Sequence, residues 1–235
     1  YGISQSGTEQ TTLHLINVAT GEALADTIPN TRACSVAWLK DNSGFYYTRY
    51  PQSGEVPEGD ENYNRHVYFH HLGADWQDDP IVFGDGRAKE NWPVVTLSDN
   101  DRWLIVMDFV TFTRSEVYAL ERESGEWRTI VDDQEAKFWG GAVDDTLFVI
   151  TDWEASRFRI LATTLSESGD TRWREIVPER ESILEDFAFA GEHLLVQGME
   201  KASSRLELFS RTGEKIRDVE LPTLGTVHGI DGQAD

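Results

Sequence analysis

The chain has 235 residues and a formal net charge of −21, which comes from 42 acidic and 21 basic side chains. A negative field of this size repels the phosphates of nucleic acids and anionic lipids, so nucleic acid is not an expected partner. No apolar run approaches the roughly 20 residues of a membrane-spanning helix, so we expect no membrane partner either.

The first thirty residues form an incomplete unit of β-structure. Residues 1–3 resemble the middle of a strand, and residues 12–18 alternate in polarity up to a turn at Thr20-Gly21-Glu22. There is no initiator methionine, so we expect a piece of a longer protein whose native N-terminus, with any targeting signal, lies upstream. The only cysteine, Cys34, fits a reducing compartment. We therefore expect a cytoplasmic location, with the periplasm as the alternative.

A unit of four short strands then recurs four times. The expected strands are 34–39, 44–50, 66–71 and 80–83, then 94–97, 103–108, 116–121 and 127–131, then 138–143, 147–152, 158–163 and 173–177, and finally 184–189, 194–198, 205–210 and 216–220. The loop at 51–64 is rich in Gly, Pro, Glu and Asn, so we expect it to be irregular and exposed. It lengthens the first unit, and the later units repeat at a period in the mid-forties. Such a period, with four strands per unit, predicts the blades of a β-propeller.

The sequence therefore predicts an all-β propeller of four-stranded antiparallel blades, with about five blade equivalents in one domain. The expected division is a partial blade at 1–29, blades at 30–86, 87–133, 134–179 and 180–222, and the start of a further blade at 223–235. Residues 226–230 would be the inner strand of that further blade. The partial blades at the two ends could complete one another or belong to separate blades of a larger ring, and the sequence leaves both possibilities open.

No motif of nucleophilic catalysis stands in the chain. The string closest to a nucleophile elbow is Gly-Ile-Ser-Gln-Ser-Gly at 2–7, which has the wrong spacing and leads from a strand into a hairpin. Cys34 has no histidine near it in sequence, so a buried structural thiol is expected. We therefore expect no catalytic residue and no cofactor in this chain.

Three histidines, His66, His70 and His71, fall on one expected strand, and alternation places His66 and His70 on the same face. Two histidines could begin a zinc site, but no cysteine or acidic residue accompanies them at metal-ligand spacing. We expect cross-strand packing and no metal. The acidic pairs at 78–79, 132–133 and 144–145 fall at turns, where Asp forms local hydrogen bonds, and we interpret them as turn formers.

Tryptophans recur at equivalent places in the units, which predicts that they pack between blades. They are Trp38, Trp92, Trp103, Trp127, Trp153 and Trp173.

Two longer strings are more specific than the repeat. They are Phe45-Tyr46-Tyr47-Thr48-Arg49-Tyr50-Pro51 and His66-Val67-Tyr68-Phe69-His70-His71-Leu72-Gly73. Weaker strings stand in order at 1–7, 36–38, 97–99, 140–141 and 176–179. Taken together over essentially the whole chain, they resemble the propeller domain of the prolyl oligopeptidase family of serine peptidases.

The resemblance implies a seven-bladed propeller that covers an α/β-hydrolase domain C-terminal to residue 235, where the Ser-Asp-His triad would lie. It implies a hydrolase that cleaves short peptides after proline, with a propeller that restricts access to the cavity. By approximate alignment Ala33, Pro93 and Val110 would face the substrate, at positions where family members often carry larger or sulfur-containing side chains. The expected partners are a short peptide and the hydrolase domain.

Two alternatives remain at this level. A stand-alone propeller could act as a scaffold for a protein partner, although it would need complete ends and this chain begins and ends within blades. A relative with the specificity of oligopeptidase B or of an acylaminoacyl peptidase would keep the peptidase class. The strings around residues 46–51 favour the prolyl oligopeptidase type.

Overall fold

The computed structural model describes residues 1–167, 169 and 171–234. Within these residues the fold is all-β, and the one helix is a short 3-10 turn, η1 (Trp76–Asp78). The chain divides into two compact units, Tyr1–Leu97 with Val106–Phe112 and Ser98–Ile105 with Thr113–Asp235. No helix among the described residues is long and apolar enough to span a bilayer.

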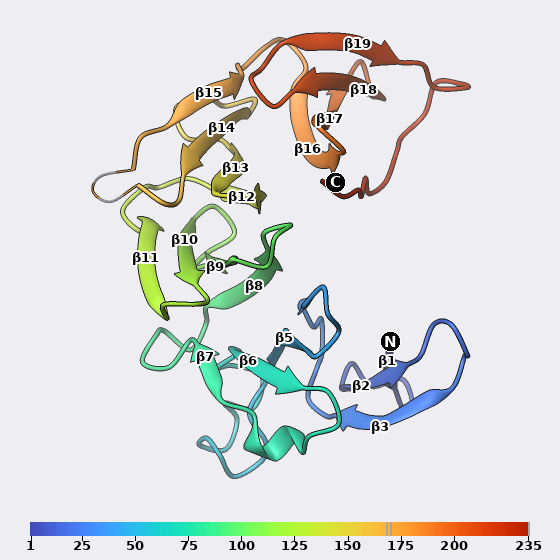
Figure 1. Cartoon of the computed structure of the whole chain (residues 1–235), viewed down its shortest axis with the longest axis vertical. Helices are drawn as coiled ribbons and strands as arrows, with labels where there is room; N and C mark the ends of the chain where they lie inside the picture. The colour runs from blue at the N-terminus through green and yellow to red at the C-terminus, as the bar shows by residue number, and fades with distance from the viewer. Residues whose placement is uncertain (168, 170, 235) are drawn as a thin grey trace. The chain divides into compact units, whose positions relative to one another are not determined.

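The first unit begins with two antiparallel sheets (Figure 1). A three-stranded sheet has the order β1-β2-β3, from β1 (Gly2–Ser4), β2 (Thr11–Ile16) and β3 (Ala23–Ile28). A four-stranded sheet has the order β4-β5-β6-β7, from β4 (Val36–Trp38), β5 (Gly44–Arg49), β6 (His66–His71) and β7 (Ile81–Phe83). The loop at 51–64 is irregular apart from an isolated bridge between Ser53 and Val56, and it is mostly exposed, which confirms the expectation.

A sheet of order β8-β9-β10-β11 follows, and the division between the two units passes through it. Its strands are β8 (Trp92–Leu97), β9 (Trp103–Phe109), β10 (Ser115–Glu121) and β11 (Glu126–Val131).

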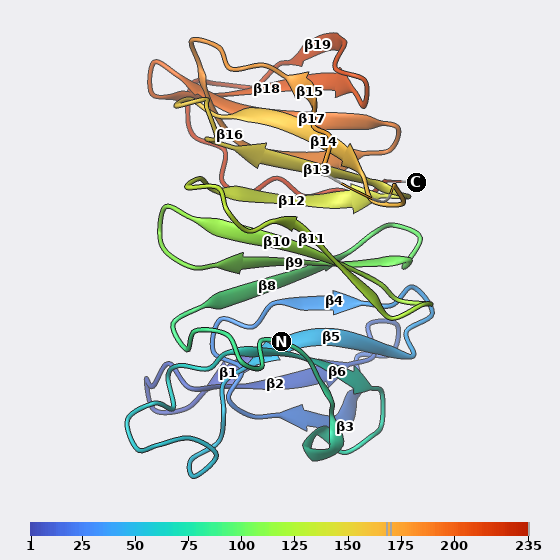
Figure 2. The ribbon, with the colours of Figure 1, turned by 90° about the vertical axis from the view of Figure 1, so that its left-hand side faces the viewer.

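The second unit contains two further four-stranded antiparallel sheets, seen edge-on in Figure 2. Their orders are β12-β13-β14-β15, from β12 (Phe138–Val143), β13 (Thr146–Thr151), β14 (Arg159–Thr164) and β15 (Arg174–Val177), and β16-β17-β18-β19, from β16 (Ile183–Ala190), β17 (His193–Glu200), β18 (Ser203–Ser210) and β19 (Lys215–Val219). The all-β fold with four-stranded antiparallel sheets is confirmed.

Burial changes from the second strand of a sheet to its last strand. Every residue of β5 is buried, as are all of β9 except Phe109 and all of β13 except Thr146. The last strands β11 and β19 are largely exposed. A strand that is buried on both faces needs no polar alternation, which is why these second strands are continuous apolar or aromatic runs in the sequence.

The core of each unit joins neighbouring sheets. In the first unit Leu13, Leu15 and Ile28 of the β1–β3 sheet pack with Phe45, Tyr47 and Tyr68 of the next sheet. In the second unit one cluster combines residues of β13 to β15, such as Ile150 and Ile160, with residues of β16 to β18, such as Leu194. The hydrophobic core therefore lies between the sheets.

The expectation for the tryptophans holds for Trp103 and Trp92. Trp103 is completely buried and donates from Nε1 to Asp145 Oδ1, which follows β12 of the next sheet, at 2.8 Å. Trp92 at the start of β8 contacts the preceding sheet, with 6.3 Å between its ring centroid and that of Tyr50. Trp173 and Trp153 instead contact Phe138 of their own sheet, with 6.0 Å and 6.3 Å between ring centroids. Trp38 and Trp127 each remain more than a third exposed. They lie on strands at the start or the end of a sheet, where less protein covers them.

A serine fixes the way in which one sheet leads into the next. Ser115 at the start of β10 donates its N–H to Ala136 O at 3.1 Å, and its Oγ accepts from Phe138 N at 2.7 Å. Ser204 repeats both bonds, with Gly225 O at 2.8 Å and Val227 N at 3.0 Å. Gly225 and Val227 thus occupy the places that Ala136 and Phe138 hold at the start of β12.

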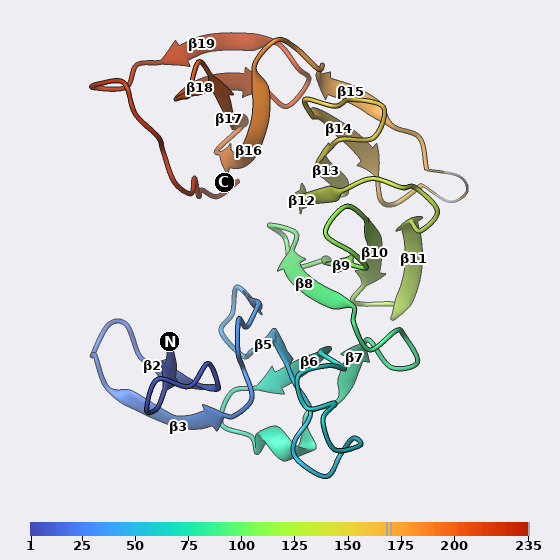
Figure 3. The same cartoon turned by 180° about the vertical axis from the view of Figure 1, so that it is seen from behind.

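The expected strand at 226–230 is nevertheless wrong, because these residues have no strand conformation. A strand needs a hydrogen-bonded neighbour, and no strand among the described residues lies beside them. Instead the segment runs along its own sheet, with Gln197 Nε2 donating to Val227 O at 3.1 Å and Gly191 N donating to Gln233 O at 2.9 Å. Figure 3 shows the segment that follows β19 returning towards β16.

The position of the core makes a direct prediction for two leucines of the second unit. Leu194→Ala removes a fully buried side chain from the cluster between β13–β15 and β16–β18 and should lower the free energy of unfolding by about 3 kcal/mol. Leu224→Ala changes a side chain that is 88% exposed and should cost less than about 0.5 kcal/mol. Urea denaturation followed by tryptophan fluorescence measures both, and equal losses would contradict a core between the sheets.

Candidate functional site

The serine and cysteine side chains that were considered as nucleophiles do not have the surroundings of one. Ser6 and Gly7 have φ angles of 55° and 72° and form an exposed tight turn, not the strand-to-helix turn of an elbow. The Cys34 thiol donates to Ser35 O at 3.4 Å, and burial raises its pKa, so that it stays protonated at neutral pH. Among the residues that the structure describes, no group of three or more His, Cys, Asp and Glu side chains is placed to hold a metal ion.

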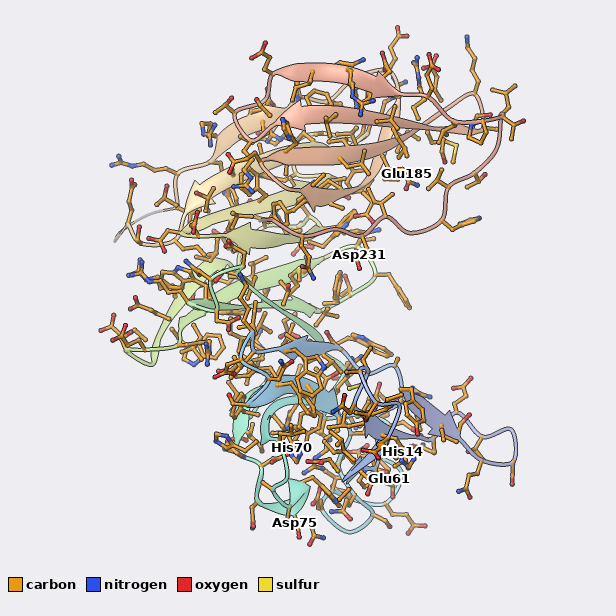
Figure 4. All side chains as sticks on the ribbon, turned by 45° about the vertical axis from the view of Figure 1, so that its right-hand side comes forward. His14, Glu61, His70, Asp75, Glu185 and Asp231 are labelled. Atoms are coloured by element: carbon orange, nitrogen blue, oxygen red, sulfur yellow. The ribbon has the colours of Figure 1, made fainter. Side chains whose placement is uncertain are left out.

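The histidine cluster contains a buried electrostatic clamp centred on His70 (Figure 4). Its Nδ1 lies 2.9 Å from Asp79 Oδ2, and its Nε2 lies 3.1 Å from Asp26 Oδ1. Asp79 also accepts from the Tyr47 hydroxyl at 2.8 Å, and Asp26 accepts from Gly73 N at 2.5 Å. The clamp connects β3 of the first sheet to β5 and β6 of the second and to the segment after η1.

The charges within this clamp depend on one another. Burial by itself would lower the pKa of His70, but the hydrogen bonds and charges of Asp79 and Asp26 outweigh it and raise the pKa. Burial by itself would raise the pKa of Asp26, but the Gly73 N–H and the His70 ring lower it. Both shifts favour an imidazolium between two carboxylates, and this ion-paired arrangement is a structural connection between the two sheets.

The expectation of simple packing for the histidines was therefore incomplete. His70 does pack on Phe45, with 5.2 Å between ring centroids, but its ion pairs with Asp26 and Asp79 come from segments far away in the sequence. The interpretation of the acidic pairs as turn formers was incomplete for the same reason. Besides Asp79, Asp145 has a role beyond its turn, because its carboxylate accepts two bonds of 2.8 Å from Arg102.

The three residues predicted to face a substrate lie at strand ends of the first unit. Ala33 is exposed in the loop before β4 and has a φ of 48°. Pro93 is buried as the second residue of β8, and Val110 is half-buried directly after β9. Their contribution to a substrate site stays a prediction, but the contacts around them show that they belong to one end of these strands.

A buried arginine, Arg65, connects the segment of Ala33 with the segment of Pro93. Arg65 directly precedes β6, and its Nη2 donates to Ala33 O and to Thr48 Oγ1, both at 2.5 Å. Its guanidinium carbon lies 4.5 Å from the ring centroid of Trp92, the neighbour of Pro93. Burial lowers the pKa of Arg65.

A buried aspartate, Asp108, connects the segment of Val110 with the start of β8. Asp108 at the end of β9 is fully buried, and its Oδ2 accepts from Asn91 Nδ2 at 2.7 Å and from Arg87 Nε at 2.5 Å. Because Asn91 immediately precedes β8, these bonds hold the end of β9, and hence Val110, beside the start of β8.

The residues around Arg65 form a group at this end of the strands. Besides the contacts of Arg65 itself, the Tyr50 ring lies 6.3 Å from the Trp92 ring. We call the group of Ala33, Thr48, Tyr50, Arg65 and Trp92 the strand-start cluster.

Arg65 and Asp108 could not be found from the sequence. Each is a single charged residue at or just beyond the end of a strand, a position that is usually solvated, and their burial follows from contacts with segments 17 to 32 residues away. The only local signal is that Asp108 ends an otherwise apolar run that begins at Trp103.

Comparison with known proteins gives a consistent result. The family model for the N-terminal β-propeller domain of prolyl oligopeptidase matches residues 1–235. A prolyl endopeptidase of Elizabethkingia miricola is 25% identical over 239 residues, which cover 99% of this chain and 33% of the relative. A prolyl endopeptidase of Elizabethkingia meningoseptica is 24% identical over 237 residues, with the same coverage. The chain therefore spans about one third of the length of these curated relatives.

Solved structures share the fold. One, from a study of two prolyl endopeptidases and their inter-domain dynamics, has a TM-score of 0.85 at 25% identity and covers 94% of this chain and 33% of its own. Prolyl oligopeptidase B of Galerina marginata, bound to a 25-residue macrocyclization substrate, has a TM-score of 0.84 at 20% identity over 96% of this chain and 34% of its own. The second likeness concerns the fold alone.

The His70 clamp predicts how stability depends on pH. The pKa of His70 is raised in the folded state, so its stabilisation is complete below the unfolded value of about 6.5 and is lost as the pH rises through the folded value. The urea midpoint should therefore fall as the pH is raised from 6 to 9. His70→Gln should lose this dependence and about 3 kcal/mol or more at pH 6, because two buried carboxylates are left without their partner.

The matched control is His14→Gln. His14 is half-buried and stacks on Tyr1 with 5.6 Å between ring centroids, away from any carboxylate pair of this kind. This variant should keep the pH dependence of the wild type. If His14→Gln removed that dependence and His70→Gln kept it, the clamp would not be its source.

Proposed function

The chain belongs to the prolyl oligopeptidase family as its N-terminal β-propeller domain, and from this we propose that it controls access of peptides to the active site of a longer serine peptidase. In that protein the Ser-Asp-His triad would lie on an α/β-hydrolase domain that follows residue 235. The substrates would be short peptides cleaved after proline. The propeller would contribute contacts and exclusion by size, and no catalytic group.

The observation that carries this proposal is the combination of a full-length match to the propeller family with strand ends gathered around the strand-start cluster. A gating domain needs side chains fixed firmly at the edge of the path that a substrate takes. Ala33 and Val110 follow or precede strands and are anchored through buried charged groups, Arg65 and Asp108. Substrate-contacting residues on loops that a rigid scaffold positions are a common arrangement in proteins.

The first test is activity of the isolated chain. It should not hydrolyse a chromogenic Gly-Pro amide, because Ser4 and Ser6 are exposed turn or strand residues and the Cys34 thiol has a raised pKa. The parent protein should hydrolyse the same amide and serves as the positive control. Turnover by the isolated chain that a serine-directed inhibitor abolishes would disprove the non-catalytic role.

The second test concerns gating in the parent protein. Ala33→Trp places a large side chain at the exposed strand end and should raise KM for an octapeptide by about threefold to tenfold, with a smaller change for a Gly-Pro amide. Val18→Trp changes a side chain that is 93% exposed in the turn region after β2 and is the control. Equal effects of Ala33→Trp on both substrates would argue against a role in size selection.

A further inference from the structure

The strand-start cluster contains a buried positive charge, Arg65, that forms no ion pair with a carboxylate among the described residues. Arg65 is only 3% exposed, and its Nη2 makes both of its hydrogen bonds. Its Nε and Nη1 have no hydrogen-bond partner among the described residues. Burial has the largest effect on the pKa of Arg65 and lowers it, and the side chains that act on it most strongly are Tyr50, Cys34 and Arg32, with no carboxylate among them.

A second open donor lies beside it. Tyr50 is also 3% exposed, and its hydroxyl has no partner of ideal hydrogen-bond geometry within the part of the chain that the structure describes. The hydroxyl oxygen faces the guanidinium groups of Arg65 and Arg32, which leaves its O–H free to donate to a ligand. The Tyr50 ring stands at 81° to the Trp92 ring, with 6.3 Å between centroids. The guanidinium of Arg32 lies 5.4 Å from the centre of the Tyr50 ring and adds further positive charge, although Glu9 pairs with it at 3.0 Å.

Two other arginines of this unit, the buried Arg49 and the half-buried Arg87, each have a carboxylate partner. Arg49 is 6% exposed, and Glu55 lies 3.7 Å from its Nη1. Arg87 pairs with Asp108 at 2.5 Å. Arg65 has the face of Trp92 and two neutral oxygens, which can accept hydrogen bonds but cannot neutralise its charge. A buried water molecule could satisfy the open N–H groups, but it would leave the charge uncompensated.

We propose that Arg65 and the Tyr50 hydroxyl form a binding site for a carboxylate at the strand-start end of the first unit. Arginine is the side chain best suited to hold a carboxylate, since its donors are charged and fixed in a plane. A carboxylate from solvent could reach the guanidinium, because Ala33 and Trp92, which contact it, are both exposed at this end. The net charge of −21 repels anions at a distance, so binding depends on these short-range bonds.

The carboxylate could be a free anion or the terminus of a peptide. The second source rests on the proposed function, since a peptide that passes Ala33 would present its carboxylate beside Arg65. The site itself does not depend on that function. Acetate tests the site, and a peptide with a free C-terminus tests its connection with the gating role.

The experiment is an NMR titration of the whole chain that follows the arginine Nε–H signals and the indole N–H signal of Trp92. The probes are acetate, the peptide N-acetyl-Gly-Pro-Ala with a free carboxylate, and the same peptide as its amide, all at one ionic strength. We expect acetate and the free acid to shift the Arg65 and Trp92 signals with saturation, and the amide to shift neither. Saturation by acetate but not by the free acid would support the site and overturn its connection with peptides.

Three variants assign the effect. Tyr50→Phe keeps the bonds of Arg65 to Ala33 and Thr48 and should weaken acetate binding by about threefold to tenfold. Arg65→Gln should abolish saturation at Trp92. Arg49→Gln, which removes a neighbouring buried arginine with its own carboxylate partner, should bind acetate as the wild type does. Shifts that fail to saturate in the wild type, or that persist unchanged in both Tyr50→Phe and Arg65→Gln, would overturn the proposal.

Discussion

A sheet of four short strands with an apolar second strand must be covered on both faces, and the rest of this structure depends on that requirement. β5 and β13 are buried almost throughout, although each belongs to a sheet that could not bury them alone. The clusters that contain Tyr47 in the first unit and Leu194 in the second unit form only where two sheets meet. Each sheet is therefore stable only with its neighbour, which is the usual condition of repeat architectures.

Covering the faces of the sheets buries polar groups, which then need hydrogen-bond or ion-pair partners. At the connections between sheets serines provide them: Ser35 exchanges hydrogen bonds with the backbone of Val95, and Ser115 does so with the backbone of Phe138. The buried His70 forms ion pairs with Asp26 and Asp79. Within the described residues, Arg65 differs in that its charge is buried without an ion pair to a carboxylate, and a buried group of this kind calls for an explanation such as a bound water or ion.

In the proposed function, the strand ends at which Ala33, Pro93 and Val110 lie would supply contacts to a peptide and no catalytic group. Their positions are fixed by buried charged groups: Arg65 holds the carbonyl of Ala33, and Asp108 holds the segment before β8. The chain can thus vary the exposed side chain at such a position while the anchoring bonds remain. This separation of anchoring from contact fits a domain that selects substrates and leaves the reaction to another.

The sequence by itself determined the repeat, the strands and the family. The apolar runs at 45–47 and 147–150 and the turns between strands are local, because a strand buried on both faces needs only a continuous apolar stretch, and the family strings are read in order along the chain. Only the tertiary structure decided which charged residues are buried and what they contact. Asp26 and His70 are 44 residues apart, and Arg65 meets Ala33 from 32 residues away. Packing of one sheet against the next brings Asp26 to His70, and strand pairing within the second sheet brings Arg65 to Ala33; no local pattern encodes either contact. For the same reason 226–230 forms no strand, since strand structure requires a neighbour that the sequence of the segment cannot supply.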